Sequence, residues 1–231
     1  MTAPSAKPLF RAMRSKAATE AASCMFGDLP RADRPGAETR REHDFYPTGQ
    51  PEAIRALLAR DGGVIRSCGA VWEPACGDGA LVREIRSFGL PCVATDLVDR
   101  GCPDSSVADF FDSTASHGRA IITNPPFNLI NARDGHGRWL RHTLALPGWS
   151  YLALLLSWDW PAARANGLGA MLDQQPFSYC YLMRWKLDFT GEGSPPQRNA
   201  WFVWRRDWRG EPAFRFLNRE DGDRINQGAL L

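Results

Sequence analysis

The chain has 231 residues, enough for one sizeable hydrophobic core with extensions, so a single domain is expected. Hydrophobic residues make up 44% and charged residues 23%, a balance that excludes a fibrous or wholly disordered chain. The formal net charge of only +2 excludes binding of nucleic acid by bulk charge alone, so such binding would need a local basic patch.

The cysteines and the apolar runs narrow the class of protein further. The six cysteines are at positions 24, 68, 76, 92, 102 and 180. They show neither paired metal-ligand spacing nor the density of a small secreted scaffold, which predicts reduced thiols and no metal site. No apolar run approaches the roughly 18 residues of a membrane span, and the start lacks a secretory signal. A cytoplasmic protein without a membrane partner is expected.

Residues 1–42 mix Ala, Ser, Pro and Arg without sustained periodicity, with eight Lys or Arg against five Asp or Glu. This composition predicts a solvated, flexible N-terminal arm. An arm that clamps DNA and an arginine-containing organelle transit segment are the alternatives.

From residue 50 onward, helices and strands are predicted to alternate. Pro51, followed by apolar residues at helical spacing, predicts a helix that ends at the Gly62-Gly63 pair. Gly79 opens a second helix that stops near Gly89. Further helices are expected over 138–146 and 161–172, and strands over 70–73, 91–97, around 107, 120–123 and 151–156. This alternation predicts an α/β fold with a doubly wound, mostly parallel sheet.

The C-terminal part departs from this alternation. Two aromatic, extended-looking runs, 177–189 and 200–205, are joined by a Gly- and Pro-rich loop and predict an antiparallel hairpin. We therefore expect seven strands, with a catalytic domain over 43–210 and a C-terminal extension over 211–231.

A candidate cofactor site begins in the segment Glu73-Pro74-Ala75-Cys76-Gly77-Asp78-Gly79, which joins a strand to a helix. Its glycines permit a tight turn and the close approach of backbone to a ligand. A glycine turn without a ligand is the alternative, because the segment is not the three-glycine dinucleotide motif.

Two further segments follow strands at matching places. Asp96 closes the next strand, 17 residues after Gly79, where a carboxylate could accept hydrogen bonds from a ribose diol. Asp109 and Phe110 end the strand after that, where they could meet an adenine, although Asp109 could equally be a helix cap. The three segments fall at the carboxyl ends of consecutive strands, where open α/β sheets bind ligands.

With these residues the sequence resembles the class I S-adenosylmethionine-dependent methyltransferases, whose first motif the 73–79 segment matches. The resemblance implies a Rossmann-like methyltransferase fold and S-adenosylmethionine as cofactor, with S-adenosylhomocysteine as product. It implies that Gly77 and Gly79 approach the methionine moiety, that Asp96 holds the ribose, and that Asp109 and Phe110 hold the adenine. The other expected cofactor contacts in this segment are Glu73, Pro74 and Cys76.

Upstream, Asp44-Phe45-Tyr46-Pro47-Thr48-Gly49 looks like the flanking motif of amino-group DNA methyltransferases, which lines the methionine end of the cofactor. That likeness adds Tyr46 and Thr48 to the expected cofactor contacts. The alternative is an ordinary N-cap with a hydrophobic staple before the helix at Pro51.

The tetrapeptide Asn124-Pro125-Pro126-Phe127 directly follows the strand at 120–123 and is the candidate catalytic motif. A planar exocyclic amine is a poor nucleophile because its lone pair is delocalised. The Asn124 side-chain oxygen and a backbone carbonyl such as that of Pro125 can accept its two hydrogens and localise the lone pair. The consecutive prolines stiffen the backbone, and Phe127 can stack on the planar substrate. Methyl transfer to a planar amine is therefore expected.

The tetrapeptide resembles the fourth motif of N6-adenine DNA methyltransferases, a family that includes N4-cytosine enzymes and is related to methylases of RNA bases and of protein glutamine. Asn or Asp in the first position is commoner among adenine enzymes, so Asn124 favours adenine. Glutamine methylases usually carry tyrosine in the fourth position, so Phe127 favours nucleic acid. In duplex DNA the base must first be extruded, at a cost of a few kcal/mol. DNA is the expected partner, and a non-catalytic cofactor-binding subunit is the alternative from another class.

The order of the motifs resembles small phage-type adenine methyltransferases. Large restriction-linked enzymes carry a separate target-recognition domain, whereas fewer than 30 residues follow the hairpin here. Recognition is therefore expected from loops, from the N-terminal arm, or from a second subunit in a homodimer. The candidate substrate contacts are Asn131, Trp185 and Arg198, with Arg184 and Lys186 as further phosphate contacts. Plain surface charge is the alternative for the cations, and His136 is expected to face solvent.

Overall fold

The structure is a computed structural model that describes residues 49–131, 136–162, 165–189 and 197–223. All of these belong to one compact unit, Glu42–Leu231. The expected arm at 1–42, the cofactor candidates Tyr46 and Thr48, and the end of the expected C-terminal extension lie outside the described residues.

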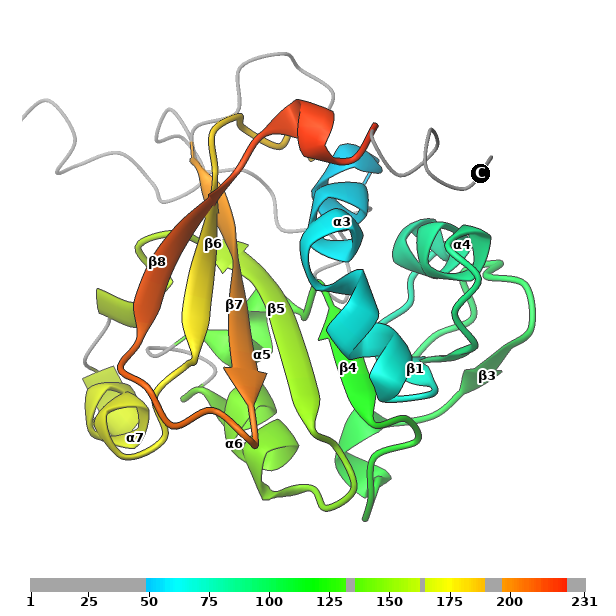
Figure 1. The fold of residues 1–231 in the computed structure, drawn as a ribbon. Coiled ribbons are helices and arrows are strands. Elements are labelled where there is room, and N and C mark those ends of the chain that lie inside the picture. Colours follow the sequence, from blue (N-terminus) through cyan, green and yellow to red (C-terminus); the bar gives the residue numbers. More distant parts are fainter. Residues whose placement is uncertain (1–48, 132–135, 163–164, 190–196, 224–231) are drawn as a thin grey trace, which may run out of the picture. The chain divides into compact units, whose positions relative to one another are not determined.

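Eight strands form one sheet in the order β3-β2-β1-β4-β5-β7-β6-β8. Their bounds are β1 Val71–Glu73, β2 Cys92–Asp96, β3 Ser105–Val107, β4 Ala120–Thr123, β5 Tyr151–Ser157, β6 Tyr179–Met183, β7 Asn199–Arg205 and β8 Ala213–Leu217. Among these eight, only β7 runs against the others, and its arrowhead points the opposite way in Figure 1. The predicted doubly wound, mostly parallel α/β fold is confirmed.

Helices cover both faces of the sheet, and its central strands β4 and β5 are accordingly near-continuous apolar runs whose side chains point alternately to the two faces. The side covered by α3 (Glu52–Ser67) and α4 (Ala80–Ser87) is called the α3 side, and its cluster includes Ile54, Leu57 and Ile122. The opposite face, called the α6 side, is covered by α5 (Phe127–Ile130), α6 (Arg138–Ala145) and α7 (Leu168–Gln174). Figure 1 shows α3 in front of the sheet and α6 behind it.

The first helix differs from the prediction, since α3 runs through the Gly62-Gly63 pair and ends only at Ser67. Gly62 is buried against α4, where an added Cβ would lie 2.6 Å from the Phe88 ring. The glycine therefore serves close packing between α3 and the residue that follows α4, rather than a helix end.

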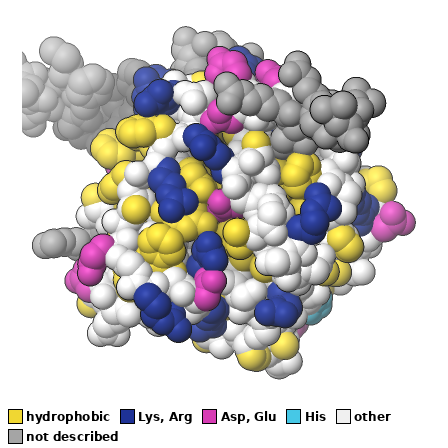
Figure 2. Space-filling model, viewed as in Figure 1, with side chains coloured by type: hydrophobic (Ala, Val, Ile, Leu, Met, Phe, Trp, Pro, Cys, Tyr) yellow, Lys and Arg dark blue, Asp and Glu magenta, His cyan; other side chains and the backbone are white. Residues whose placement is uncertain are grey.

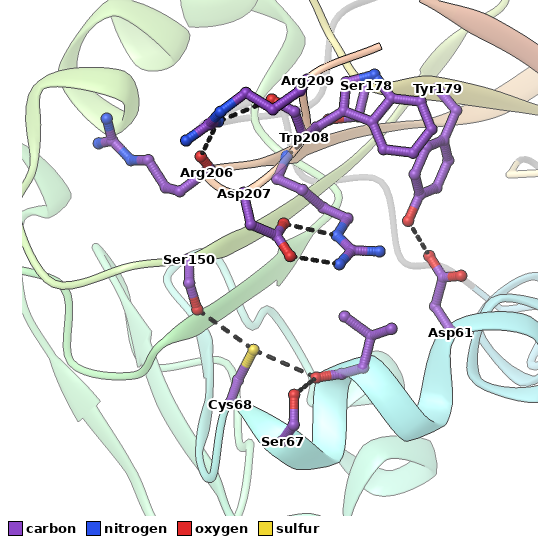
Figure 3. Close-up of polar contacts among 12 residues, drawn as sticks. Asp61, Ser67, Cys68, Ser150, Ser178, Tyr179, Arg206, Asp207, Trp208 and Arg209 are labelled. Carbon is purple, nitrogen blue, oxygen red and sulfur yellow. Dashed lines mark hydrogen bonds and ion pairs between the residues drawn. The ribbon is translucent and has the colours of Figure 1, made fainter.

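A buried carboxylate fastens α3 to the sheet on the α3 side. Asp61 accepts hydrogen bonds from the hydroxyls of Tyr151 at 2.8 Å, Tyr179 at 3.0 Å and Tyr181 at 2.7 Å. Burial raises the pKa of all three tyrosines, with the Asp61 charge as the second cause. Figure 3 shows the contact from Tyr179, with the Cys68 to Ser150 contact at the end of α3 nearby. Three hydroxyl donors satisfy a charge that would otherwise be costly to bury.

The helix predicted over 161–172 is shorter than expected. A 3-10 turn, η3 (Trp160–Ala162), follows β5, a second turn, η4 (Ala165–Gly167), comes next, and α7 begins at Leu168. Asn166 at φ +52° and Gly167 at φ +73° interrupt the regular backbone. Two consecutive left-handed residues end any continuous helix at this point.

The predicted hairpin is present as the antiparallel pair of β6 and β7. The structure adds an eighth strand, β8, which pairs in parallel with β6 inside the expected C-terminal extension. Arg215 on β8 lies over the Tyr179 ring at 4.1 Å. Figure 2 shows Lys and Arg side chains around apolar groups on the side of the molecule seen in Figure 1. After β8, the turn η5 (Arg219–Asp221) returns to α3 through the ion pair of Arg219 with Glu52.

None of the helices in the described part of the chain is both long and apolar enough to cross a membrane.

Candidate active site

A pocket opens at the carboxyl ends of β1 and β4, the two central strands between which the chain reverses its winding direction. Such a switch point is where doubly wound sheets bind ligands. The pocket is partly open to solvent, and the empty space, open mouth included, is about 1010 Å³.

The pocket brings together segments that lie far apart in the sequence. Parts of the wall come from the loop after β1, the end of β2, the turn η2 (Phe110–Asp112), the tetrapeptide with α5, and α6. The wall residues are Glu73, Pro74, Ala75, Cys76, Gly77, Asp78, Ala80, Leu81, Asp96, Leu97, Arg100, Asp109, Phe110, Phe111, Asn124, Pro125, Pro126, Phe127, Asn128, Leu129 and Trp139. All four candidate catalytic residues therefore share one wall with most of the candidate cofactor contacts.

The loop after β1 is shaped by left-handed backbone. Gly77 has φ +55° and Gly79 has φ +82°, a region that L side chains rarely adopt. Gly79 is the N-cap of α4, and an added Cβ there would lie 2.7 Å from Cys102 Sγ. Gly79 is outside the pocket wall, so its contribution is to set the direction in which the loop enters the helix.

Asp96 ties the loop to β2. Its Oδ2 accepts a hydrogen bond from the Gly77 N–H at 2.8 Å, and its Oδ1 accepts one from the Val98 N–H at 3.1 Å. A carboxylate offers about four acceptor positions, so each oxygen keeps capacity for a ligand hydroxyl. Asp96 thus fixes the loop and still faces the pocket.

Glu73 ends β1 in the pocket wall and is only 1% exposed. Burial raises its pKa to about 8, and the nearby Asp96 charge adds to the increase, while the Thr123 hydroxyl and the Ala75 N–H lower it. Oε1 accepts the Ala75 N–H at 3.1 Å, but Oε2 is buried without a hydrogen bond to the described residues, because the Thr123 hydroxyl does not reach the carboxyl group with hydrogen-bond geometry. One oxygen of a largely protonated carboxyl group is therefore available to a ligand.

The third segment supplies both a helix cap and part of the pocket wall. Asp109 Oδ1 accepts the Phe111 N–H at 2.9 Å, so the helix-cap alternative for Asp109 is confirmed, and the residue also lines the pocket. Phe110 is 6% exposed and stacks on Trp139 with ring centroids 4.0 Å apart. Trp139 thus backs the wall that Phe110 offers to a planar ligand.

The tetrapeptide leaves β4 and turns at once into a short helix. Pro126 has the extended ψ of +121° and is the N-cap of α5, which starts at Phe127. The Asn131 side-chain amide donates to the Phe127 carbonyl at 2.9 Å and closes the other end of α5. Asn131 therefore holds the helix that carries Phe127, and it is not among the wall residues.

The other substrate candidates also lie off the pocket wall. Trp185 packs against the core cluster on the α3 side, and Arg198 is exposed at the start of β7. His136 is exposed as well, although residues 132–135 of its loop lie outside the described residues.

Some wall residues were not predicted from the sequence. Leu97 is 53% exposed and sits directly after Asp96, and Trp139 comes from α6, more than ten residues beyond the tetrapeptide. The signal that the sequence offered for Leu97 was its position directly after Asp96, the candidate ribose contact. Trp139 reads as an ordinary core residue of an amphipathic helix, and only the packing of α6 brings it to the pocket.

No protein-family model matches the chain, and no curated protein sequence is detectably similar to it. Solved structures do match. A protein from Listeria monocytogenes assigned as a class I S-adenosylmethionine-dependent methyltransferase aligns with a TM-score of 0.53 at 11% identity, over 81% of this chain and 70% of that one. The methyltransferase subunit of a type I restriction-modification system from Streptococcus thermophilus gives 0.51 at 13% identity, over 74% and 47%.

A third match is a protein from Pyrococcus horikoshii assigned as an RNA methyltransferase, with a TM-score of 0.52 at 11% identity, over 82% of this chain and 98% of that one. The chain spans about half the length of the restriction-modification subunit. These likenesses show that the chain has the class I methyltransferase fold.

Proposed function

We propose that this chain is an S-adenosylmethionine-dependent methyltransferase that acts on the exocyclic N6 amine of adenine in DNA. The observation that carries the proposal is that Asn124-Pro125-Pro126-Phe127 and the glycine loop after β1 line the same pocket at the switch point of the sheet. A motif for activating a planar amine and a cradle for a cofactor are useful only together.

The pocket residues fit the proposed cofactor. Glu73 presents a buried oxygen without a hydrogen-bond partner among the described residues, which suits an ammonium group. Asp96 suits a ribose diol, and Leu97 and Phe110 offer apolar surface to a base. When bound, S-adenosylmethionine supplies an electrophilic methyl group on a sulfonium sulfur. Gly77 lets the backbone approach that end of the ligand, and its N–H is already held by Asp96.

The tetrapeptide makes the exocyclic amine a better nucleophile. The Asn124 side-chain oxygen and the Pro125 carbonyl accept the two amino hydrogens, which localises the lone pair on nitrogen. Phe127, at the start of α5 in the pocket wall, stacks on the base plane. Because an amide is not a strong base, the proton left on the methylated nitrogen passes to solvent.

Adenine in RNA is the second candidate. The observation in its favour is the match to a protein of comparable length that is assigned as an RNA methyltransferase. Cytosine N4 and protein glutamine share the same chemistry, but Asn124 in the first position and Phe127 in the fourth favour adenine over both.

Transfer of labelled methyl from S-adenosylmethionine tests the proposal, with unmethylated DNA, RNA and protein offered in parallel and nucleosides separated after digestion. N6-methyladenine in DNA is the expected product, and label only in RNA or only in protein would overturn the substrate. Asn124→Ala should lower kcat about 100- to 1000-fold, the loss typical of removing one transition-state hydrogen-bond partner. Gln174→Ala, which removes an exposed amide on α7, is the control and should keep full activity. Cofactor binding without turnover on any substrate would indicate a non-catalytic subunit.

A further inference from the structure

Four exposed side chains lie at the pocket end of the sheet, on strands beyond the tetrapeptide. Trp158 follows β5, Arg198 precedes β7, Arg184 follows β6 and Phe216 is near the end of β8. The sheet order β4-β5-β7-β6-β8 places them in this sequence, leading away from Asn124 at the end of β4. Figure 1 shows these strands side by side across the sheet. We call the four residues the edge track.

The two members nearest the pocket belong to one strand pair. The Trp158 N–H donates to the Arg198 carbonyl at 3.1 Å, which extends the β5–β7 ladder by one pair. Residues that face each other in an antiparallel pair project to the same side of the sheet. Leu156, two residues before Trp158, belongs to the core cluster on the α6 side, so alternation places Trp158 and Arg198 on that side.

The two outer members are in direct contact. The Arg184 guanidinium lies 4.7 Å from the centroid of the Phe216 ring, and Arg184 donates to Asn218 Oδ1 at 3.3 Å. Leu217, the neighbour of Phe216, belongs to the α3-side cluster, so Phe216 projects to the α6 side. Phe127 and Trp139, which line the pocket, belong to the α6 side too. The edge track therefore continues from the pocket on one face.

The composition of the edge track is that of a surface for nucleic acid. Trp158 is 49% exposed and Phe216 is 46% exposed, so each offers an aromatic surface to water. Proteins that bind single-stranded nucleic acid commonly combine aromatic rings that stack on bases with cationic side chains that contact phosphates. The positive charges of Arg184 and Arg198 complement the negative charge of a polyanion. Asp159, next to Trp158, is the exposed carboxylate nearest in sequence to the edge track.

We propose that the edge track binds an unpaired nucleic acid strand on one side of the target base. This proposal rests on the proposed function, since it takes the pocket as the place of the target adenine. Neighbouring strands lie about 4.8 Å apart, so the four steps from β4 to β8 cover about 19 Å, a length of a few nucleotides. Trp158 and Phe216 stack bases, and Arg198 and Arg184 contact the intervening phosphates.

Binding of the full chain to labelled oligonucleotides, followed by fluorescence anisotropy, tests the proposal. The probes are a single-stranded DNA, an RNA of the same sequence and the blunt DNA duplex. Single strands should bind more tightly than the duplex, and comparing the DNA and RNA arms identifies the strand type. Trp158→Ala should raise the Kd for the single strand about 5- to 150-fold, the range that base–aromatic stacking of about 1–3 kcal/mol gives. Trp158→Phe should retain most of the affinity.

Arg184→Ala and Arg198→Ala should each weaken binding and make it less dependent on salt, because each removes a phosphate contact. Arg209→Ala, an exposed arginine in the loop after β7, is the matched control and should bind as the unmodified chain does. Flanking nucleotides should strengthen binding when added on one side of the target adenine and have little effect on the other. Equal effects of both flanks, a preference for duplex, or unchanged binding by Trp158→Ala would overturn the proposal.

The readouts separate this proposal from the proposed function. Asn124→Ala should bind the strand normally and lose methyl transfer, whereas edge-track variants should raise the KM for the oligonucleotide and leave kcat nearly unchanged. Methyl transfer by the unmodified chain together with an edge track whose variants change nothing would overturn only the edge track. Strand binding that depends on the edge track, without methyl transfer to any nucleic acid, would overturn only the proposed function.

Discussion

Glu73 is a buried carboxyl group in the pocket wall. Burial raises its pKa to about 8, so the folded chain holds a proton that the unfolded chain releases near the ordinary value of 4.5. Its contribution to the free energy of unfolding is therefore fully present below pH 4.5 and is lost as the pH rises through 8. At neutral pH the Glu73 carboxyl group is mostly protonated, and a cation that binds beside it would favour the ionised form.

We expect the free energy of unfolding of the unmodified chain to fall by a few kcal/mol between pH 5 and pH 8 relative to Glu73→Gln, which has no proton to lose. Denaturant titrations across this range measure the difference. Glu211→Gln, at an exposed site, should follow the unmodified chain. Parallel pH curves for Glu73→Gln and the unmodified chain would contradict the raised pKa.

The same residue gives a test of cofactor contact. Positive charge near Oε2 would lower the Glu73 pKa, so binding of S-adenosylmethionine near pH 7 should release protons. Calorimetry in buffers of different ionisation enthalpy measures this release, which should disappear in Glu73→Gln.

Gly79 shows how a residue outside the pocket wall can shape it. Gly79→Ala places a Cβ 2.7 Å from Cys102 Sγ at a positive φ, whereas Gly89→Ala meets only the positive φ, because nothing lies within 4 Å. Gly89→Ala should therefore cost about 1–2 kcal/mol, and Gly79→Ala should cost more and weaken cofactor binding. Thermal unfolding and a binding titration measure both effects. Cys102→Ala in the Gly79→Ala background should restore part of the loss, and no restoration would mean that the contact with sulfur is unimportant.

At the scale of elements, two sets of buried hydrogen bonds fix the position of α3 across β5, β7 and β6. Asp61 accepts three tyrosine hydroxyls that come from β5 and β6, and the Trp201 indole on β7 donates to the Ala53 carbonyl of α3 at 2.9 Å. The helix is thereby held in register over the strands that continue the sheet beyond the pocket.

Asp61→Ala leaves three buried hydroxyls without their acceptor and should lower the free energy of unfolding by about 3–5 kcal/mol. Asp173→Ala, on the exposed part of α7, should change it by less than about 1 kcal/mol. Urea titrations measure both variants. Because Asp61 is not in the pocket wall, the folded fraction of Asp61→Ala should keep its cofactor affinity. A large loss of affinity in folded protein would show that α3 positions the pocket.

The edge of the sheet shows how an element can escape prediction. β8 has the exposed Phe214, Arg215 and Phe216 in succession, without the alternation of a half-buried strand. Arg215 nevertheless covers Tyr179, and the strand gains its hydrogen bonds from β6, some 30 residues earlier. The residues within and around β8 therefore do not predict its pairing with β6.

For the whole molecule, the parallel half of the sheet and its ligand-binding edge follow from local signals. Short apolar runs, the left-handed glycines of the loop after β1 and Asn124 after β4 are each encoded within a few residues, and short right-handed connections leave few ways to assemble them. The prediction that these segments meet at one edge was therefore within reach of the sequence. Which ligand oxygen or nitrogen each residue contacts remains a prediction.

By itself, the sequence determined the doubly wound class, the antiparallel hairpin and the gathering of the candidate catalytic and cofactor residues, because period, turn chemistry and strand order are local properties. The tertiary structure alone decided that α3 continues through Gly62 against Phe88 and that Trp185 packs against the core. It also decided that Trp158 and Arg198 lie opposite each other at the end of the β5–β7 pair. Each of these outcomes depends on a partner far away in the chain, and contacts of that kind are fixed by packing and not by the residues on either side.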